Sequence, residues 1–200
     1  MAAPAKLNYK IYQGSTFQEI FRWESETKVY LPISSISKSA PCVITTTTTP
    51  DLPVGWRFRV VGAGGMKELN SVSDTWYLAT AVDRQEKTIE INQVNSLGYS
   101  TYTNGGVVEY NTPVPISQYS ARMQIRETVD SDVVIHTATT ENGGISIDAA
   151  HSTITINIPA TVTEAFSFTS AVYAVELYTS SGTVITFLTG NLTLVPEVTR

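Results

Sequence analysis

The sequence predicts an all-β fold, a sandwich or a barrel, and two observations lead to that class. Short runs rich in β-branched and aromatic residues recur along the chain, and Gly, Pro, Asn and Ser separate them. Strands that recur every 8–12 residues or so, with turn residues between them, are typical of sandwiches and barrels. Helical patterns are nearly absent, since only residues 160–165 (ATVTEA) could form a short helical turn.

The expected strands alternate apolar and polar residues, so that one face of each is buried. Residues 56–61 are the plainest case, with Trp56, Phe58 and Val60 on one face and two arginines on the other. Glycines in segments 105–106, 142–144 and 180–182 are typical of turns that need a positive φ. The predicted strands are residues 7–12, 16–23, 43–46, 56–61, 75–82, 88–91, 107–110, 119–126, 133–137, 152–158, 171–179 and 183–188.

Two similar segments suggest how the chain is divided. Residues 31–37 (LPISSIS) and 114–120 (VPISQYS) share an apolar residue followed by Pro-Ile-Ser. They are either a true repeat or the points where the chain leaves and re-enters one sandwich, and we favour the second interpretation. It predicts a discontinuous sandwich of residues 1–37 and 113–200, with a small module of residues 38–112 inserted in it.

Composition narrows the classes of function. Charged residues make up 16% of the chain, against about 25% in typical soluble domains, which favours surfaces that other subunits later cover. The net charge is −5 and the 13 basic residues are dispersed, so we expect no direct binding to nucleic acid. We also expect no signal peptide and no membrane-spanning segment, because no sustained apolar run occurs.

The single cysteine and the two histidines give no reactive pattern. Cys42 precedes the apolar Val43 and is expected in the core, and a single cysteine cannot form a disulfide within the chain. His136 and His151 lie far along the chain and are expected to be ordinary strand or turn residues. No His or Cys pair has metal-ligand spacing. The glycine-rich segment 62–67 (GAGGMK) lacks the Ser/Thr and helix of a phosphate loop, so we expect a turn.

Carboxylates and tyrosines are the remaining candidates for a catalytic, metal-binding or sugar-binding site. Glu24 with Glu26, and Asp130 with Asp132, could act as acid and base, but both pairs are expected in solvated loops. Asp130 and Asp132 could also offer oxygens to calcium, which needs six or more. Three tyrosines near a Gly-Gly turn could stack on sugars, although a small barrel core needs such aromatics too: Tyr99, Tyr102 and Tyr110. The sequence therefore predicts no enzyme, and no catalytic, cofactor-binding or metal-binding residue.

Several segments together resemble a known family. These are residues 119–126 (YSARMQIR), 141–148 (ENGGISID), 152–159 (STITINIP), 172–177 (VYAVEL) and the terminus 196–200 (PEVTR). Their succession is similar to small virion proteins of tailed bacteriophages, with the immunoglobulin-like sandwich of tail and baseplate accessory proteins. Residues 12–17 (YQGSTF) and 21–23 (FRW) resemble the opening hairpin of that sandwich.

The middle of the chain resembles a small β-barrel module that is often inserted in phage tail proteins and is related to a half-domain of ubiquitin-activating enzymes. The similar segments are residues 52–56 (LPVGW), 65–70 (GMKELN), 89–92 (IEIN) and 99–106 (YSTYTNGG). No cysteine or nucleotide chemistry comes with this similarity. The combined resemblance implies an all-β immunoglobulin-like sandwich interrupted by an inserted small β-barrel.

The resemblance also implies a function. We expect a structural protein of the virion, assembled in the bacterial host cytoplasm and placed on the tail side: neck, tail, baseplate or fibre attachment. Its partners would be other phage virion proteins, with the chain forming a homo-oligomeric ring or present in multiple copies in the particle, and we expect no direct contact with nucleic acid or membrane. A head-decoration protein of the capsid and a carbohydrate-binding receptor module are the alternatives.

Overall fold

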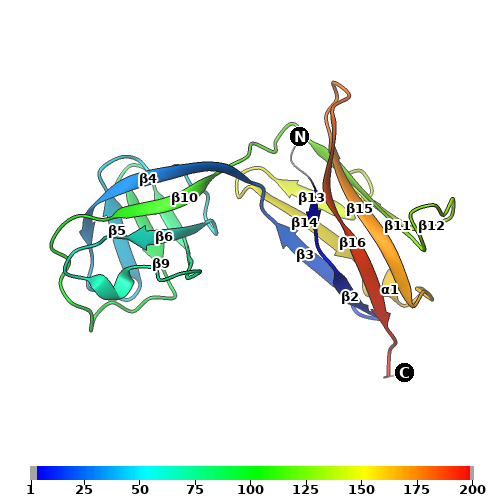
Figure 1. The fold of residues 1–200 in the computed structure, drawn as a ribbon, viewed down its shortest axis with the longest axis horizontal. Coiled ribbons are helices and arrows are strands. Elements are labelled where there is room, and N and C mark those ends of the chain that lie inside the picture. Colours follow the sequence, from blue (N-terminus) through cyan, green and yellow to red (C-terminus); the bar gives the residue numbers. More distant parts are fainter. Residues whose placement is uncertain (1–3, 199–200) are drawn as a thin grey trace. The chain divides into compact units, whose positions relative to one another are not determined.

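The computed structural model describes residues 4–198, and the chain is all-β, as predicted (Figure 1). Helix is confined to one turn of α-helix, α1 (Ala160–Thr163), and one 3₁₀ turn, η1 (Lys67–Leu69), within the described residues. The chain forms two compact units. Unit 1 comprises the residues up to Arg22, Pro115–Ala149 and those from Thr153 on; unit 2 comprises Trp23–Val114 and Ala150–Ser152.

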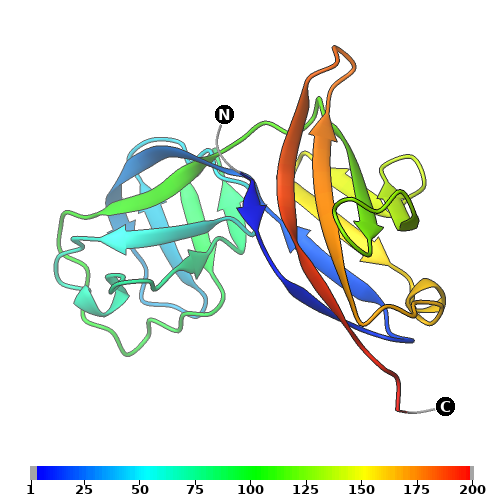
Figure 2. The same cartoon turned by 45° about the vertical axis from the view of Figure 1, so that its right-hand side comes forward.

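Unit 1 is a sandwich of two sheets (Figures 1 and 2). The larger sheet, sheet A, has the order β1-β16-β15-β11-β12, with β2 also paired to β16. Its strands are β1 (Ala5–Lys6), β2 (Tyr9–Tyr12), β11 (Ser120–Arg126), β12 (Val134–Thr139), β15 (Ser170–Tyr178) and β16 (Val184–Val195). Sheet B has the order β13-β14-β3, formed by β3 (Phe17–Phe21), β13 (Ile145–Asp148) and β14 (Thr153–Ile158).

The strand order is that of the immunoglobulin fold. β11, β15 and β16 occupy the places of its C, F and G strands, and β3, β14 and β13 those of B, E and D. β1 and β2 pair with β16 in parallel, whereas the other pairs are antiparallel. All of unit 2 except the short segment 150–152 lies in the chain between β3 and β11, so the sandwich is interrupted by an inserted domain.

The core of unit 1 follows from the alternation of its strands. In β15, Ala171, Tyr173, Val175 and Leu177 are buried, and the residues between them face outward. Tyr9 packs edge-on against Phe17, with ring centroids 5.6 Å apart. Full burial of a large apolar side chain, such as Val175 or Leu177 of β15, stabilises the fold by about 1.5–3 kcal/mol relative to its exposure to water.

Unit 2 is one strongly curved sheet, a half-barrel, in the order β7-β6-β10-β4-β5-β9-β8. Its strands are β4 (Glu24–Ile36), β5 (Cys42–Thr46), β6 (Arg57–Val61), β7 (Tyr77–Leu78), β8 (Ala81–Asp83), β9 (Thr88–Ile91) and β10 (Val107–Pro113). The long strand β4 pairs with β10 along its first part and with β5 along its last. A register shift between Ile33 and Ser35 lies where β4 changes partner, and such irregularities bend a strand.

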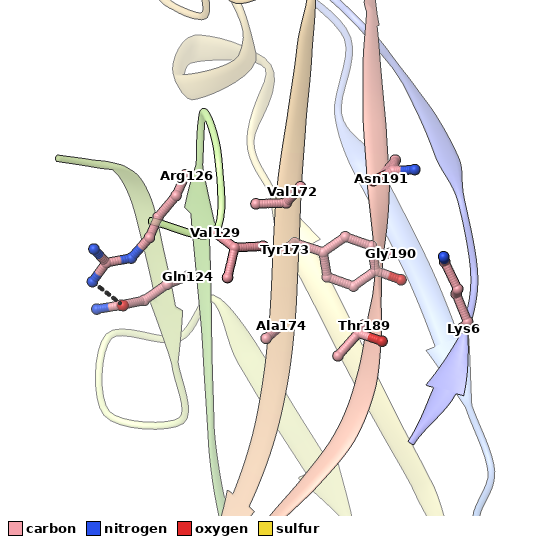
Figure 3. Close-up of a pocket in the computed structure, with 10 residues that line it drawn as sticks. All are labelled: Lys6, Gln124, Arg126, Val129, Val172, Tyr173, Ala174, Thr189, Gly190 and Asn191. Atoms are coloured by element: carbon pink, nitrogen blue, oxygen red, sulfur yellow. Dashed lines mark hydrogen bonds between the residues drawn. The ribbon is translucent and has the colours of Figure 1, made fainter. Parts of the chain in front are cut away.

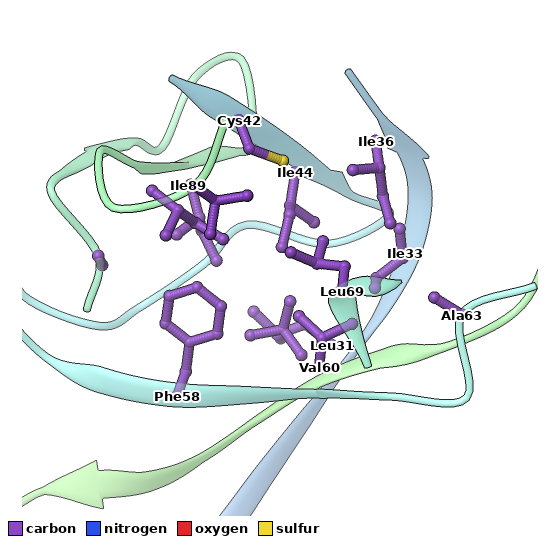
Figure 4. Close-up of a cluster of buried hydrophobic side chains, with 14 of the residues drawn as sticks. Leu31, Ile33, Ile36, Cys42, Ile44, Phe58, Val60, Ala63, Leu69 and Ile89 are labelled. Atoms are coloured by element: carbon purple, nitrogen blue, oxygen red, sulfur yellow. The ribbon is translucent and has the colours of Figure 1, made fainter. Parts of the chain in front are cut away.

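The half-barrel encloses its own core (Figure 4). Trp56, Phe58 and Val60 are fully buried, as the alternation predicted, and Arg57 and Arg59 lie on the outer face. The indole N–H of Trp56 donates to the carbonyl of Asn111 at 2.9 Å, so the largest buried side chain also satisfies its polar atom.

The structure divides the chain at other points than the sequence suggested. We expected the insert to span residues 38–112, whereas unit 2 begins at Trp23 and its main segment ends at Val114. The reason is β4, which pairs only within unit 2. Leu31 and Ile33 accordingly lie in the core of unit 2, whereas Ile116 is buried in unit 1, so the two Pro-Ile segments are not equivalent.

Candidate interaction surface

Cys42 is a core residue of unit 2. It is fully buried in β5, as predicted, and its thiol lies 3.9 Å from the carbonyl of Ser37. Burial raises the pKa of the Cys42 thiol, so the thiolate needed for nucleophilic attack is disfavoured. The cysteine therefore serves packing.

The histidines lie where the sequence predicted, His136 in strand β12 and His151 in a turn. The His136 ring packs edge-on against Phe166, with centroids 5.9 Å apart. Burial lowers the pKa of His136, which favours the neutral imidazole. His, Cys, Asp and Glu form no group of three or more that could hold a metal ion within residues 4–198.

The glycine-rich segment 62–67 is a structural loop. The amide of Ala63 donates to the side-chain oxygen of Asn70 at 2.8 Å, and the side-chain nitrogen of Asn70 donates back to the Ala63 carbonyl at 3.0 Å. The amides of Gly64, Met66 and Lys67 donate to backbone carbonyls. With these donors engaged, the loop does not offer the row of free N–H groups that a phosphate site needs.

The carboxylate pairs lie in different settings. Our expectation of a solvated loop for Glu24 and Glu26 was wrong, because both lie in strand β4. Arg57 holds Glu24 through two hydrogen bonds of 2.7 and 2.8 Å, so this carboxylate has a structural partner. Asp130 and Asp132 do lie in an exposed loop, the one between β11 and β12.

The three tyrosines belong to the core of unit 2. Tyr110 is 2% exposed, and Tyr99 and Tyr102 are partly buried against the core. The Tyr102 hydroxyl donates to the carbonyls of Ile33 and Gly105. All three rings thus take part in the packing of unit 2, as a small barrel core requires.

The outer face of sheet A contains a trough of about 430 Å³ (Figure 3). Its floor is made of short side chains on the two central strands, Val172 and Ala174 from β15 and Thr189 from β16. Gln124 and Arg126 of β11 form one wall, and Lys6 of β1 lies on the opposite side. Val129, Tyr173, Gly190 and Asn191 complete the lining.

The strand registers fix this arrangement. Gln124 lies opposite Ala174, Ala174 opposite Thr189, and Thr189 opposite Lys6, so these four residues form one row across the sheet. Arg126 lies in the next row, opposite Val172. In the first row the long side chains of Gln124 and Lys6 stand at the two ends with short ones between them, and Arg126 extends the wall beside Gln124, so the face is concave.

The trough has surplus positive charge. Arg126 donates to the carbonyl of Ser131 and, at 2.9 Å, to the side-chain oxygen of Gln124, both of which are neutral groups. Lys6 makes no ion pair with any described residue. A neighbouring hollow contains the paired Arg122 and Glu176, 2.7 Å apart. The chain as a whole has a net charge of −5, so the trough differs in sign from the protein around it.

The loop between β11 and β12, residues 127–133, adjoins the trough and has the opposite character. We call it the acidic loop. It exposes two apolar side chains, Val129 at 81% and Val133 at 72%. It also exposes three carboxylates with no ion pair to any described residue, namely Glu127, Asp130 and Asp132.

A second exposed cluster lies on the outer face of unit 2. The guanidinium of Arg57 stacks over the ring of Trp76, 4.4 Å from its centroid, and that of Arg59 lies 5.9 Å away. Cations over an indole face attract its π electrons. Arg57 is neutralised by Glu24. Arg59 makes no ion pair with any described residue, and its buried Nε has no hydrogen-bond partner.

Sequence reasoning did not single out the residues of the trough. The alternation of residues 119–126 did place Arg122, Gln124 and Arg126 on one exposed face. Lys6 could not be added, because its parallel pairing with β16 joins residues more than 180 positions apart. No protein-family model and no curated protein matches the chain. Within the described residues, no helix has the length and apolar character needed to cross a membrane.

Proposed function

We propose that this chain is a structural protein of a tailed bacteriophage particle, placed on its tail side and acting by protein–protein assembly. The proposal rests on the similarity of residues 119–126, 141–148, 152–159 and 196–200 to phage virion proteins. The immunoglobulin-like sandwich with an inserted half-barrel is consistent with that similarity.

The observation that most supports an assembly role is the exposed face of sheet A. A concave, cationic surface with an adjoining acidic and apolar loop is suited to contact with another protein. The two side chains that could most readily react have structural roles: Cys42 is buried in the core of unit 2, and Glu24 is paired with Arg57.

We expect copies of the chain to contact one another through faces more than through the edge of sheet A at β12. Free edge strands readily pair with a neighbour's strand. At β12, however, the side chain of Asn142 accepts from the amide of Thr139 at 2.8 Å and donates to the carbonyl of Thr137 at 3.0 Å. The amide of Thr140 donates to the carbonyl of Ala121 in β11. Because successive residues of a strand turn their backbone groups to opposite sides, the Thr139 amide and the Thr137 carbonyl point away from β11, towards the open edge. Asn142 thus blocks part of this edge.

Quantitative mass spectrometry of purified particles tests the proposal. Particles from a phage encoding the chain would be separated into heads and tails, and the chain quantified in each. We expect several copies per particle in the tail fraction. Recovery only with heads would favour decoration of the capsid instead, and absence from washed particles would refute a virion role. A glycan array with the intact chain would test the carbohydrate-binding alternative.

A further inference from the structure

The trough and the acidic loop are complementary to each other. The trough has an apolar floor of Val172 and Ala174, with Lys6 and Arg126 at its sides. The loop alternates apolar and acidic side chains, with Val129 and Val133 on either side of Asp130 and Asp132. The two exposed valines would lose contact with water by packing on this floor, and the carboxylates would pair with the cations.

The dimensions agree with this match. Lys6 and Gln124 lie three strands apart in one row, which corresponds to about 14 Å at a strand spacing of about 4.8 Å. The acidic loop joins two antiparallel neighbours, β11 and β12, whose backbones are therefore only about 5 Å apart. The base of the loop is thus narrower than the distance between Lys6 and Gln124.

A loop cannot enter the trough of its own molecule in this way, because it already forms part of the rim. Val129 lines the trough, and Arg126, the last residue of β11, holds the loop through the carbonyl of Ser131. A loop of this kind that occupies the trough would therefore come from another molecule. A second copy of the same chain offers an occupant with the required charge and apolar side chains.

We infer that two copies of this chain form a two-fold dimer in which the acidic loop of each lies in the cationic trough of the other. The exchange is reciprocal because loop and trough adjoin on one face: when the second copy inserts its loop into the first trough, the first loop meets the second trough. Such a self-complementary contact closes as a pair. The inference deepens the proposed assembly role and rests on it for its biological purpose.

Charge reversal tests the dimer with the full-length chain. One variant reverses the loop, Asp130→Lys with Asp132→Lys. The other reverses the charge of the trough, Lys6→Glu with Gln124→Glu. It keeps Arg126, whose guanidinium can still donate to a side-chain oxygen at position 124. A control, Asp74→Lys with Glu86→Lys, makes the same change in net charge as the loop reversal at exposed positions of unit 2.

The readout is the molar mass in sedimentation equilibrium over about 5–200 µM chain, because a contact limited to two loops and two troughs is expected to give a micromolar Kd. We expect the native chain and the control variant to reach twice the monomer mass of 21.8 kDa. Each reversal alone should raise the dimer Kd at least 10-fold. An equimolar mixture of the two reversals should restore the dimer, since both loop–trough contacts again pair opposite charges.

Three results would overturn the dimer: a native chain that stays monomeric throughout, reversals that still dimerise, or a mixture that stays monomeric although both variants are folded. Circular dichroism and thermal melting establish folding. If a reversal fails to fold, Val129→Ser with Val133→Ser replaces it, with weaker dimerisation expected and unchanged dimerisation contradicting the inference. A monomeric result leaves the virion proposal standing, because that proposal is decided by the composition of purified particles.

Discussion

The backbone carbonyl of Leu7 lies against Gly190, at the place where a β-carbon on residue 190 would stand. The Tyr173 hydroxyl donates to the same carbonyl at 3.0 Å, and the Leu7 amide donates to the carbonyl of Thr189 at 2.9 Å. Glycine at position 190 thus lets the segment between β1 and β2 run close against β16, and the pairing of β1 with β16 places Lys6 beside the trough.

Replacing Gly190 by alanine should therefore destabilise unit 1. The added methyl group would collide with backbone atoms of Leu7, which cannot move without loss of both hydrogen bonds. Overpacking of this kind costs about 1–3 kcal/mol. Urea unfolding of the two proteins would measure the difference in free energy of unfolding.

The matched control is Gly98→Ala, because a β-carbon there has no heavy atom within 4 Å and the residue has no positive φ. It should change the free energy of unfolding by less than about 0.5 kcal/mol. Equal effects of the two substitutions would contradict the proposed collision at Gly190.

Asn142 protects the edge of sheet A. Its side-chain oxygen accepts from the amides of Thr139 and Gly144, and its side-chain nitrogen donates to the carbonyl of Thr137. Asn142→Ala should leave these backbone groups to solvent or to a neighbouring strand, with a loss of about 1 kcal/mol of stability. We expect faster hydrogen exchange at the Thr139 amide and more aggregation on storage. Unchanged exchange at Thr139 would show that Asn142 does not close this edge.

The Glu24–Arg57 pair should contribute measurably to unit 2. Its geometry is bidentate, and the guanidinium also stacks on Trp76. Arg57 is about half exposed, at 49% of its side chain, so solvent weakens the pair. A double-mutant cycle of Glu24→Gln and Arg57→Gln should give a coupling energy of about 0.5–1 kcal/mol.

The pair of Asp51 and Arg84 is the control for that cycle. It has one contact of 3.3 Å, and its side chains are 90% and 57% exposed. Its coupling energy should lie near zero, as is common for exposed ion pairs. A coupling as large as that of Glu24 and Arg57 would mean that bidentate geometry adds nothing here.

Strand positions were largely predictable because most strands of this chain have one buried face. Residues 88–91 coincide with β9, and residues 171–179 match β15 within one residue. β4 was missed because only Leu31, Ile33 and Ile36 are buried among its 13 residues and Pro32 interrupts it. Its stability comes from pairing with β10 and β5, and pairing between distant segments leaves no local pattern. The boundary of unit 2 was misplaced for the same reason.

The interaction face was only half predictable. Alternation alone places Gln124 and Arg126 on an outer face, and the exposed Asp130 and Asp132 follow from a polar loop. The third component, Lys6, reaches the trough through a parallel pairing of β1 with β16 that Gly190 makes possible. Such a long-range contact depends on the whole sandwich, so no window of sequence around residue 6 contains it.

His136 should make unit 1 sensitive to pH. Burial against Phe166 lowers the pKa of His136 below its ordinary value of 6.5, so the unfolded chain binds the proton more readily than the folded one. The free energy of unfolding contributed by this group is thus fully present above pH 6.5. It decreases as the pH falls through 6.5 towards the lower pKa of the folded state.

The prediction is checked by comparing the native chain with His136→Leu in urea unfolding at pH 7.5 and pH 5.5. The leucine keeps an apolar contact with Phe166 but cannot take up a proton. Carboxylates titrate mainly below this range and are common to both proteins, so their contribution cancels in the difference. We expect the native chain to lose more stability than the variant between the two pH values. An equal loss in both proteins would mean that His136 can be protonated in place without disturbing its packing in β12.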